Sequence, residues 1–174
     1  GHWENRSNTL TQEFMAHSKP HKVTVICTAN ICRSPIGERL LAQALQKEKE
    51  PLCQLTVVSA GVAASPGYPA SNFSVDVLDN EGIDLSGHRS QPLTQTLVDE
   101  SLFIVGMTDS HSDIIEAIFK TRKGQVRLFR EFVGEGKKTE IPDPFGGSLV
   151  LYNETLESMK EAIPSLVDFI RKHA

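Results

Sequence analysis

The chain has 174 residues, of which 39% are hydrophobic and 23% are charged, a composition typical of one globular domain. Its net charge of −4 gives no electrostatic support to nucleic-acid binding, and its apolar runs are shorter than a membrane span. The three cysteines Cys27, Cys32 and Cys53 do not fit a secreted disulfide framework. We therefore expect a cytoplasmic protein without membrane or nucleic-acid partners.

The first 20 residues are mostly polar, and the apolar stretch of a signal peptide is not seen there. We expect residues 1–20 to be a flexible tail and residues 21–174 to form a single domain.

Short β-rich runs alternate with helical periodicity along this domain. A buried strand is predicted at 23–26, and the helix after it is expected to have Ser34 as N-cap and Pro35 in its first turn. The other predicted elements are strands at 54–59, 102–105 and 126–129 and helices at about 73–81, at 109 or 110 to 119 and at 152–170. Pro164 is expected to kink the last helix or to end its first half.

Alternating strands and helices predict an α/β fold of three layers, α/β/α, around a four-stranded parallel sheet. In such folds the functional site lies at the carboxyl ends of the strands. The loop after the first strand is therefore the first candidate.

That loop runs from Cys27 to Pro35 and leads directly into a helix. Backbone N–H groups and the helix dipole at such a place form an anion site, and Arg33 can hold two phosphate oxygens. The same positive field favours the nucleophilic thiolate at Cys27, and Ser34 can donate to that sulfur. The spacing Cys-x5-Arg alone also fits a buried cysteine and a surface arginine, but the strand and helix around it favour a phosphate-binding loop.

This segment resembles the loop Cys-x-Gly-Asn-x-Cys-Arg-Ser of the low-molecular-weight protein tyrosine phosphatase family, and the resemblance extends from about Val23 to Ile170. It implies the phosphotyrosine protein phosphatase I-like fold and hydrolysis of phosphoproteins through a phosphocysteine intermediate, with no metal or cofactor. The loop residues expected to surround the phosphate are Thr28, Ala29, Asn30, Ile31, Cys32 and Ser34. Ala29 stands where the family usually has Gly, and its Cβ could strain the loop if φ were positive there.

The resemblance also implies a general acid at Asp143, in the segment Asp143-Pro144-Phe145, although Asp-Pro is also common in turns. Ser59 and His88 match family residues that hydrogen-bond the loop asparagine, here Asn30, whose family counterpart is left-handed. We expect both to support the loop rather than to react.

Cys32 has two interpretations. The resemblance implies a reversible disulfide with Cys27 that protects the nucleophile from over-oxidation, whereas a simpler interpretation is a packing residue. Cys53 is expected to be a core or surface filler, and the histidines other than His88 are expected to lie on the surface or in the tail.

Residues at the mouth of the loop bear on the choice of substrate. Ile31 and Phe145 are expected to line the mouth, and an apolar β-branched residue at position 31 resembles the tyrosine-specific members. The segment Phe145-Gly146-Gly147 resembles a branch that removes phosphate from arginine. We expect a protein tyrosine phosphatase, with a protein arginine phosphatase as the alternative.

Two further functions remain open. An arsenate reductase of this fold uses additional downstream cysteines, but no cysteine follows Cys53. An inactive phosphate-binding or thiol-redox module would have no need to keep Cys27, Arg33 and Asp143 together.

Overall fold

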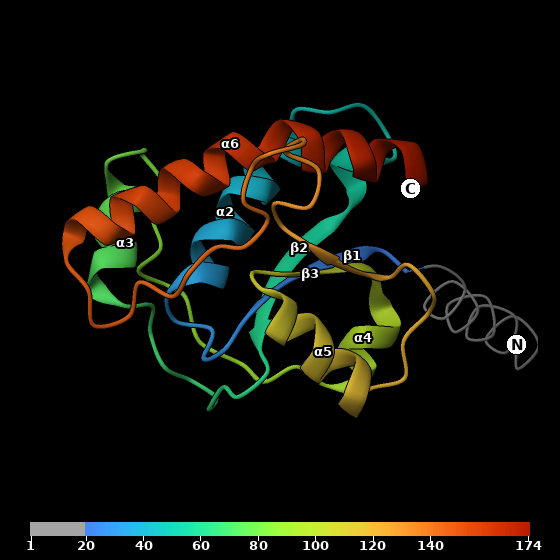
Figure 1. The fold of residues 1–174 in the computed structure, drawn as a ribbon, viewed down its shortest axis with the longest axis horizontal. Coiled ribbons are helices and arrows are strands. Elements are labelled where there is room, and N and C mark those ends of the chain that lie inside the picture. The colour runs from blue at the N-terminus through green and yellow to red at the C-terminus, as the bar shows by residue number, and fades with distance from the viewer. Residues whose placement is uncertain (1–19) are drawn as a thin grey trace, which may run out of the picture.

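The computed structural model describes residues 20–174, so the expected tail lies, apart from residue 20, outside the described residues. Its centre is a parallel sheet in the order β2-β1-β3-β4 (Figure 1). The strands are β1 (Lys22–Cys27), β2 (Thr56–Gly61), β3 (Ser101–Gly106) and β4 (Val126–Leu128), and the helices are α2 (Arg33–Gln46), the 3₁₀ turn η1 (Leu52–Gln54), α3 (Asn72–Asp79), α4 (Gln95–Glu100), α5 (Asp109–Ile118) and α6 (Leu149–His173). The predicted α/β class and parallel sheet are confirmed.

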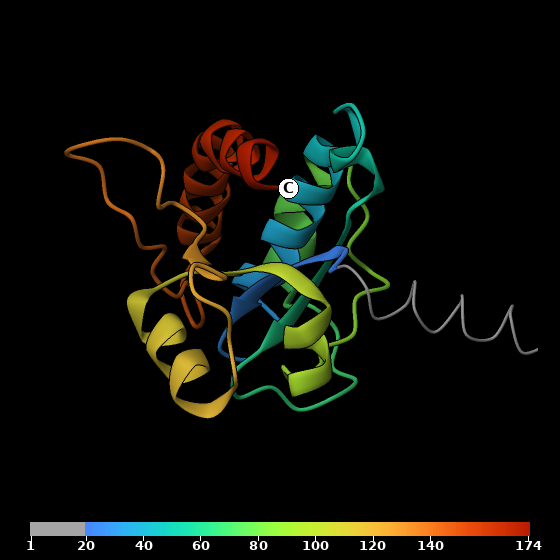
Figure 2. The same cartoon turned by 90° about the vertical axis from the view of Figure 1, so that its right-hand side faces the viewer.

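The helices form a layer on each side of the sheet, as the two perpendicular views show (Figures 1 and 2). Helices α2, α3 and α6 pack together over one face, and α4 and α5 cover the other. No helix among residues 20–174 is both long and apolar enough to cross a membrane.

Alternate side chains of β1 pack into the two hydrophobic cores, one on each face of the sheet. Val23, Val25 and Cys27 belong to the cluster under α2 and α6, whereas Ile26 belongs to the smaller cluster under α4 and α5. Successive side chains of a strand point to opposite faces, so a strand buried on both sides is mostly apolar. This register places Cys27 at the carboxyl end of β1, on the face covered by α2.

The predicted element boundaries needed several corrections. The strand predicted at 54–59 lies at Thr56–Gly61, because residues 52–54 form η1. The short helix α4 was not predicted, although Thr94 caps it by accepting from the N–H of Leu97. The cap of α5 is Thr108 rather than Asp109 or Ser110.

The beginning of α2 differs from the prediction in a way that matters for the site. The helix starts at Arg33 with Cys32 as N-cap, and no side chain caps it. Ser34 therefore lies inside the first turn, where its hydroxyl contacts other side chains instead of the helix end. The N-terminal N–H groups of α2 have no side-chain cap.

Of the two outcomes expected at Pro164, a kink or an end of the helix, the end is wrong. Helix α6 continues from Leu149 to His173 with Pro164 inside it. Pro164 is exposed, so the carbonyl that loses its N–H partner can bond water, while Ala162 and Leu166 beside it stay buried.

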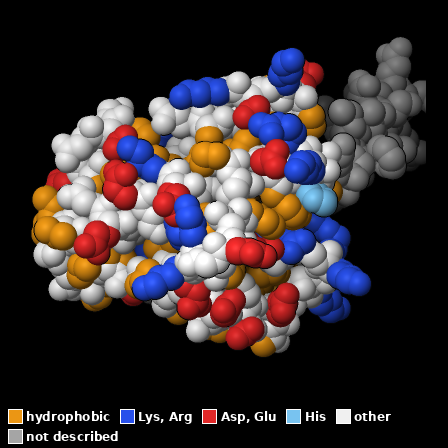
Figure 3. Space-filling model, turned by 45° about the horizontal axis from the view of Figure 1, so that its top comes forward, with side chains coloured by type: hydrophobic (Ala, Val, Ile, Leu, Met, Phe, Trp, Pro, Cys, Tyr) orange, Lys and Arg blue, Asp and Glu red, His pale blue; other side chains and the backbone are white. Residues whose placement is uncertain are grey.

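Charges are mixed on the face shown in Figure 3, where Lys and Arg side chains lie among Asp and Glu. Leu149, Val150 and Leu151, at the start of α6, are exposed hydrophobic residues.

Candidate active site

The loop between β1 and α2 bends at Asn30, which has a φ of 60° and is the only non-glycine residue with positive φ among residues 20–174. Asparagine tolerates this left-handed conformation better than most residues. Ala29 has no positive φ, so the strain that its Cβ could have caused does not arise.

The backbone N–H groups of the loop are unpaired in the part of the chain that the structure describes. No acceptor among the described residues receives the N–H groups of residues 28–32. Buried N–H groups without a partner are costly, and Asn30 and Cys32 are buried. Together with the uncapped start of α2, these donors suit a bound oxyanion.

Asn30 holds the loop through four hydrogen bonds. Its Nδ2 donates to Ser34 Oγ at 2.8 Å and to Ser59 Oγ at 2.9 Å. Its Oδ1 accepts from the N–H of Gln91, which fixes the orientation of the amide. His88 Nε2 donates to the carbonyl oxygen of Asn30 at 2.7 Å. The contacts expected of Ser59 and His88 are therefore present.

The same network determines the direction of the Ser34 hydroxyl. Ser34 Oγ accepts from Asn30, and it lies 3.0 Å from Cys27 Sγ. A hydroxyl has one proton to donate, so the Ser34 proton is available to the sulfur.

Glu38 completes this network, and the sequence analysis missed it. Its carboxylate accepts from Ser59 Oγ at 2.9 Å. Burial raises the pKa of Glu38, and the hydrogen bond from Ser59 acts in the opposite direction. The spacing held a signal, because Glu38 follows Ser34 by four residues and so lies on the same helix face.

Arg33 is buried and only partly paired. Its Nη1 donates to the carbonyl oxygen of Ile141 at 3.0 Å, and its Nη2 lies 3.4 Å from Thr28 Oγ1. Its Nε has no hydrogen-bond partner. An unpaired donor on a buried guanidinium is available to hydrogen-bond a bound oxyanion.

Asp143 lies close to this guanidinium, with Oδ2 3.8 Å from Arg33 Nη2 and about half of its side chain exposed. Its Oδ1 accepts from the N–H of Phe145, an Asp-Pro turn contact that the sequence also allowed. The segment is anchored two residues earlier, where Ile141 N–H donates to Met107 O and Ile141 O accepts from Arg33. Arg33 thus holds the Asp143 segment as well as facing the loop.

A cavity of about 260 Å³ joins these parts. It is lined by Cys27, Thr28, Ala29, Ile31, Cys32, Arg33, Asp143 and Phe145. Both residues expected to form the substrate wall, Ile31 and Phe145, line it, and Phe145 is 69% exposed. Asn30, Ser34, Ser59 and His88 lie behind the cavity and hold its loop.

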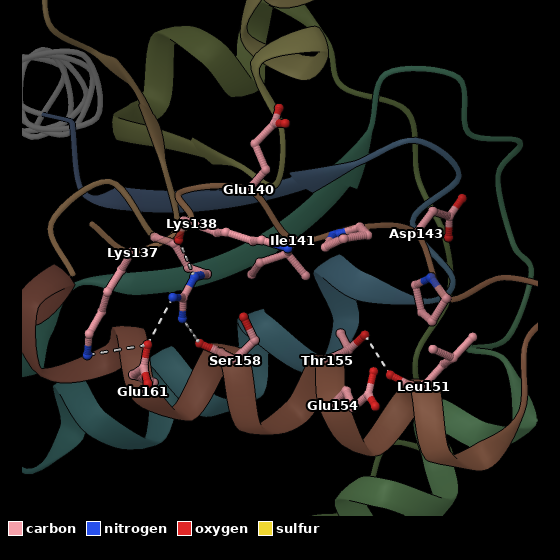
Figure 4. Close-up of a pocket in the computed structure, with 13 residues that line it drawn as sticks. Lys137, Lys138, Glu140, Ile141, Asp143, Leu151, Glu154, Thr155, Ser158 and Glu161 are labelled. Carbon is pink, nitrogen blue, oxygen red and sulfur yellow. Dashed lines mark hydrogen bonds and ion pairs between the residues drawn. The ribbon is translucent and has the colours of Figure 1, made fainter. Parts of the chain in front are cut away.

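A second cavity, of about 450 Å³, lies beside the first between the Asp143 segment and α6 (Figure 4). Lys137 to Asp143 run along one side, and Leu151 to Glu161 run along the other. Arg130 joins the two sides, because its Nε donates to Lys138 O while Nη1 and Nη2 donate to Ser158 O and Glu161.

The cysteines are all free thiols. Cys32 is buried with its Sγ 3.3 Å from Tyr152 Oη, a contact the sequence did not indicate. Burial raises the pKa of the Cys32 thiol and raises that of Tyr152 to about 12. Cys53 is exposed, so it is not a core residue.

His111 corrects the expectation that the remaining histidines lie on the surface. It is 3% exposed, and its Nε2 lies 3.0 Å from Thr28 Oγ1. Burial lowers the pKa of His111 to about 4, and the nearby Arg33 charge acts in the same direction.

A parallel α/β sheet with a cysteine, an arginine and unpaired N–H groups at the end of β1 defines an oxyanion-binding, cysteine-dependent class of site. Comparison with known proteins gives the family. The profile described as "Low molecular weight phosphotyrosine protein phosphatase" matches residues 22–174, and the chain belongs to this family of enzymes.

Relatives and a solved structure agree. The chain is 37% identical to the low molecular weight protein-tyrosine-phosphatase Etp of Escherichia coli, over 75% of this chain and 82% of that protein. It is 33% identical to the protein-arginine-phosphatase of Bacillus subtilis, over 86% and 97%. A YwlE arginine phosphatase mutant with a phosphorylated active-site serine superposes with a TM-score of 0.78 and 32% identity, covering 87% of this chain and 96% of that one.

Proposed function

We propose that this protein is a protein tyrosine phosphatase that works through a phosphocysteine intermediate at Cys27. The observation that carries the proposal is the buried Arg33 guanidinium with an orphaned Nε, beside a loop whose N–H groups have no partner. These donors suit the three outer oxygens of a phosphoryl group.

In the first step, the Cys27 thiolate attacks phosphorus and the bond to the leaving oxygen breaks. Arg33 and the loop N–H groups stabilise the charge on the phosphoryl oxygens. Asp143 donates a proton to the leaving oxygen, and its position 3.8 Å from Arg33 places it at the rim of the same cavity.

In the second step, Asp143 takes a proton from a water molecule that attacks the phosphocysteine. The sulfur leaves as a thiolate, and the Ser34 hydroxyl, directed by Asn30, donates to it. The phosphorylated serine in the related arginine phosphatase mutant supports a covalent intermediate on this loop.

Phosphotyrosine is the substrate we favour, because the cavity wall at Ile31 is apolar and can pack against an aryl ring. The guanidinium of phosphoarginine carries N–H donors, and Ile31 has no group to accept them. Phosphoarginine remains the second candidate, since Phe145 can form a wall for either side chain and two relatives are arginine phosphatases.

The other two functions receive less support. No cysteine after Cys53 is available for an arsenate-reductase relay. A phosphate-binding or thiol-redox module would have no use for a carboxylate held at the rim by Arg33. We also propose that the protein works in the cytoplasm, where its three free thiols would stay reduced.

The test is kcat/KM on matched phosphotyrosine and phosphoarginine peptides of one sequence, with Cys27→Ser as the blank. Preference for phosphotyrosine supports the proposal, and preference for phosphoarginine selects the second candidate. Activity no higher than the blank on both peptides would contradict phosphatase function.

A further inference from the structure

We propose that Thr28 is a side-chain donor to the bound phosphoryl group, and that His111 is a positioning residue that directs its proton. Thr28 lines the active-site cavity and is exposed, whereas His111 is buried behind it. The proposal rests on the proposed function only for the identity of the anion.

The direction of the hydrogen bond between the two residues follows from the other ring nitrogen. The N–H of Met107 donates to His111 Nδ1 at 3.3 Å, and a backbone N–H can only donate. Nδ1 therefore has no proton, and the neutral ring has its proton on Nε2. Nε2 lies 3.0 Å from Thr28 Oγ1, so it is the donor in this contact.

Arg33 donates to the second lone pair of the same hydroxyl oxygen. Its Nη2 lies 3.4 Å from Thr28 Oγ1, and a guanidinium can only donate. A hydroxyl oxygen has two lone pairs and one proton. Both lone pairs of Thr28 are thus taken by His111 and Arg33.

The Thr28 proton must consequently point away from both donors. No acceptor among residues 20–174 receives it. Thr28 lines the same cavity as Cys27 and Arg33, so the free proton is available to an anion bound there. A phosphoryl oxygen held by Arg33 is the acceptor that this arrangement suits.

Titration calorimetry with inorganic phosphate tests the role of Thr28 without any need for turnover. Thr28→Val keeps the shape and removes the proton, so phosphate should bind about ten-fold more weakly, as for a lost bond to a charged group. Thr28→Ser keeps the hydroxyl and should bind close to wild type. Thr94→Val is the matched control, because it removes the capping hydroxyl of α4 away from the cavity and should leave phosphate affinity unchanged.

His111 is tested in the same assay by a double-mutant cycle. His111→Leu should weaken phosphate binding in the wild type but add nothing in the Thr28→Val background, since it acts through that hydroxyl. His111→Gln, which can donate to Thr28, should restore much of the affinity. An additive effect of His111→Leu would overturn the positioning role.

The outcomes separate this inference from the proposed function. Phosphate affinity that Thr28→Val leaves unchanged overturns the inference alone. Weaker phosphate binding in Thr28→Val, together with no hydrolysis of either phosphopeptide by the wild type, supports the inference and contradicts the phosphatase. A wild type that binds no phosphate overturns the inference, and hydrolysis of the phosphopeptides still decides the proposed function.

Discussion

Ser34 Oγ lies 3.0 Å from Cys27 Sγ, and the Asn30 amide donates to the same hydroxyl, so its proton is left for the sulfur. This donor matters most when Cys27 becomes the leaving group in the second step. The contact therefore links the fold of the loop to a particular step of the reaction.

Replacing Ser34 with Ala should slow breakdown of the phosphocysteine. A lost hydrogen bond to a charged sulfur predicts a kcat lower by about 10- to 100-fold, with a larger burst of leaving group. Rapid-mixing kinetics with p-nitrophenyl phosphate measures both. Ser101→Ala, which removes another buried serine hydroxyl at the start of β3, should leave kcat unchanged. Equal loss in the two variants would point to a general packing defect.

Asn30 combines a left-handed backbone with the hydrogen bonds that hold the loop. Asn30→Ala and Asn30→Gly both lose the amide, but only Ala adds backbone strain. Asn30→Ala should thus be less stable than Asn30→Gly by about 1 kcal/mol in urea unfolding. Both should lose activity, and an active Asn30→Gly variant would show that the amide network is dispensable.

Arg130 holds the Asp143 segment against α6 through Lys138, Ser158 and Glu161. Arg130→Met keeps much of the side-chain volume and removes these donors, so the segment should position Asp143 less well. We expect kcat/KM, which reports formation of the phosphocysteine, to fall about ten-fold on alkyl-type leaving groups, which need a proton, and much less on p-nitrophenyl phosphate. Phosphate affinity should stay at the wild-type value, because the loop at Cys27 is untouched. Equal loss on both substrates would contradict this role.

The pKa of His111, lowered to about 4, predicts pH-dependent stability. The unfolded chain takes up a proton at about pH 6.5 and the folded chain only near pH 4, so the unfolded state binds more protons between these values. Stability should be full above pH 6.5 and fall by up to about 3 kcal/mol as the pH is lowered to 4. Urea unfolding of the wild type and His111→Gln across this range isolates the effect, because the variant lacks the titrating ring. Parallel pH profiles would show that His111 does not cause the slope.

Cys32 should affect recovery from oxidation if it pairs with Cys27, as the family resemblance implies. After peroxide treatment and then dithiothreitol, the wild type should regain activity, and Cys32→Ser should regain less. Cys53→Ser serves as the control because Cys53 does not line the active-site cavity. Equal recovery in all three proteins would leave Cys32 as a packing residue beside Tyr152.

The sequence predicted well where a local pattern decides the structure. The apolar run before Cys27 and the change to helical spacing after Arg33 place the loop, and strand alternation places the sheet. The loop motif also named Arg33, Ser34 and Asn30. The general acid Asp143 was predicted from the family resemblance and not from spacing, because it lies more than a hundred residues from the loop.

Contacts between distant segments could not be predicted in this way. In the sequence, His111 is a polar residue near the expected start of a helix. The packing of α5 against β3 buries it behind Thr28. In the sequence, Arg130 looks like an ordinary surface charge. In the structure it is held between α6 and the Asp143 segment. Pro164 shows the converse, because burial on either side of an exposed proline outweighs its local preference.

The most direct test of the account is to trap the covalent intermediate. Rapid acid quench during turnover of a phosphotyrosine peptide, followed by mass spectrometry, should find phosphate on the peptide that contains Cys27, in the wild type and in larger amount in Ser34→Ala. Turnover without phosphate on Cys27, or turnover that survives Cys27→Ser, would contradict it.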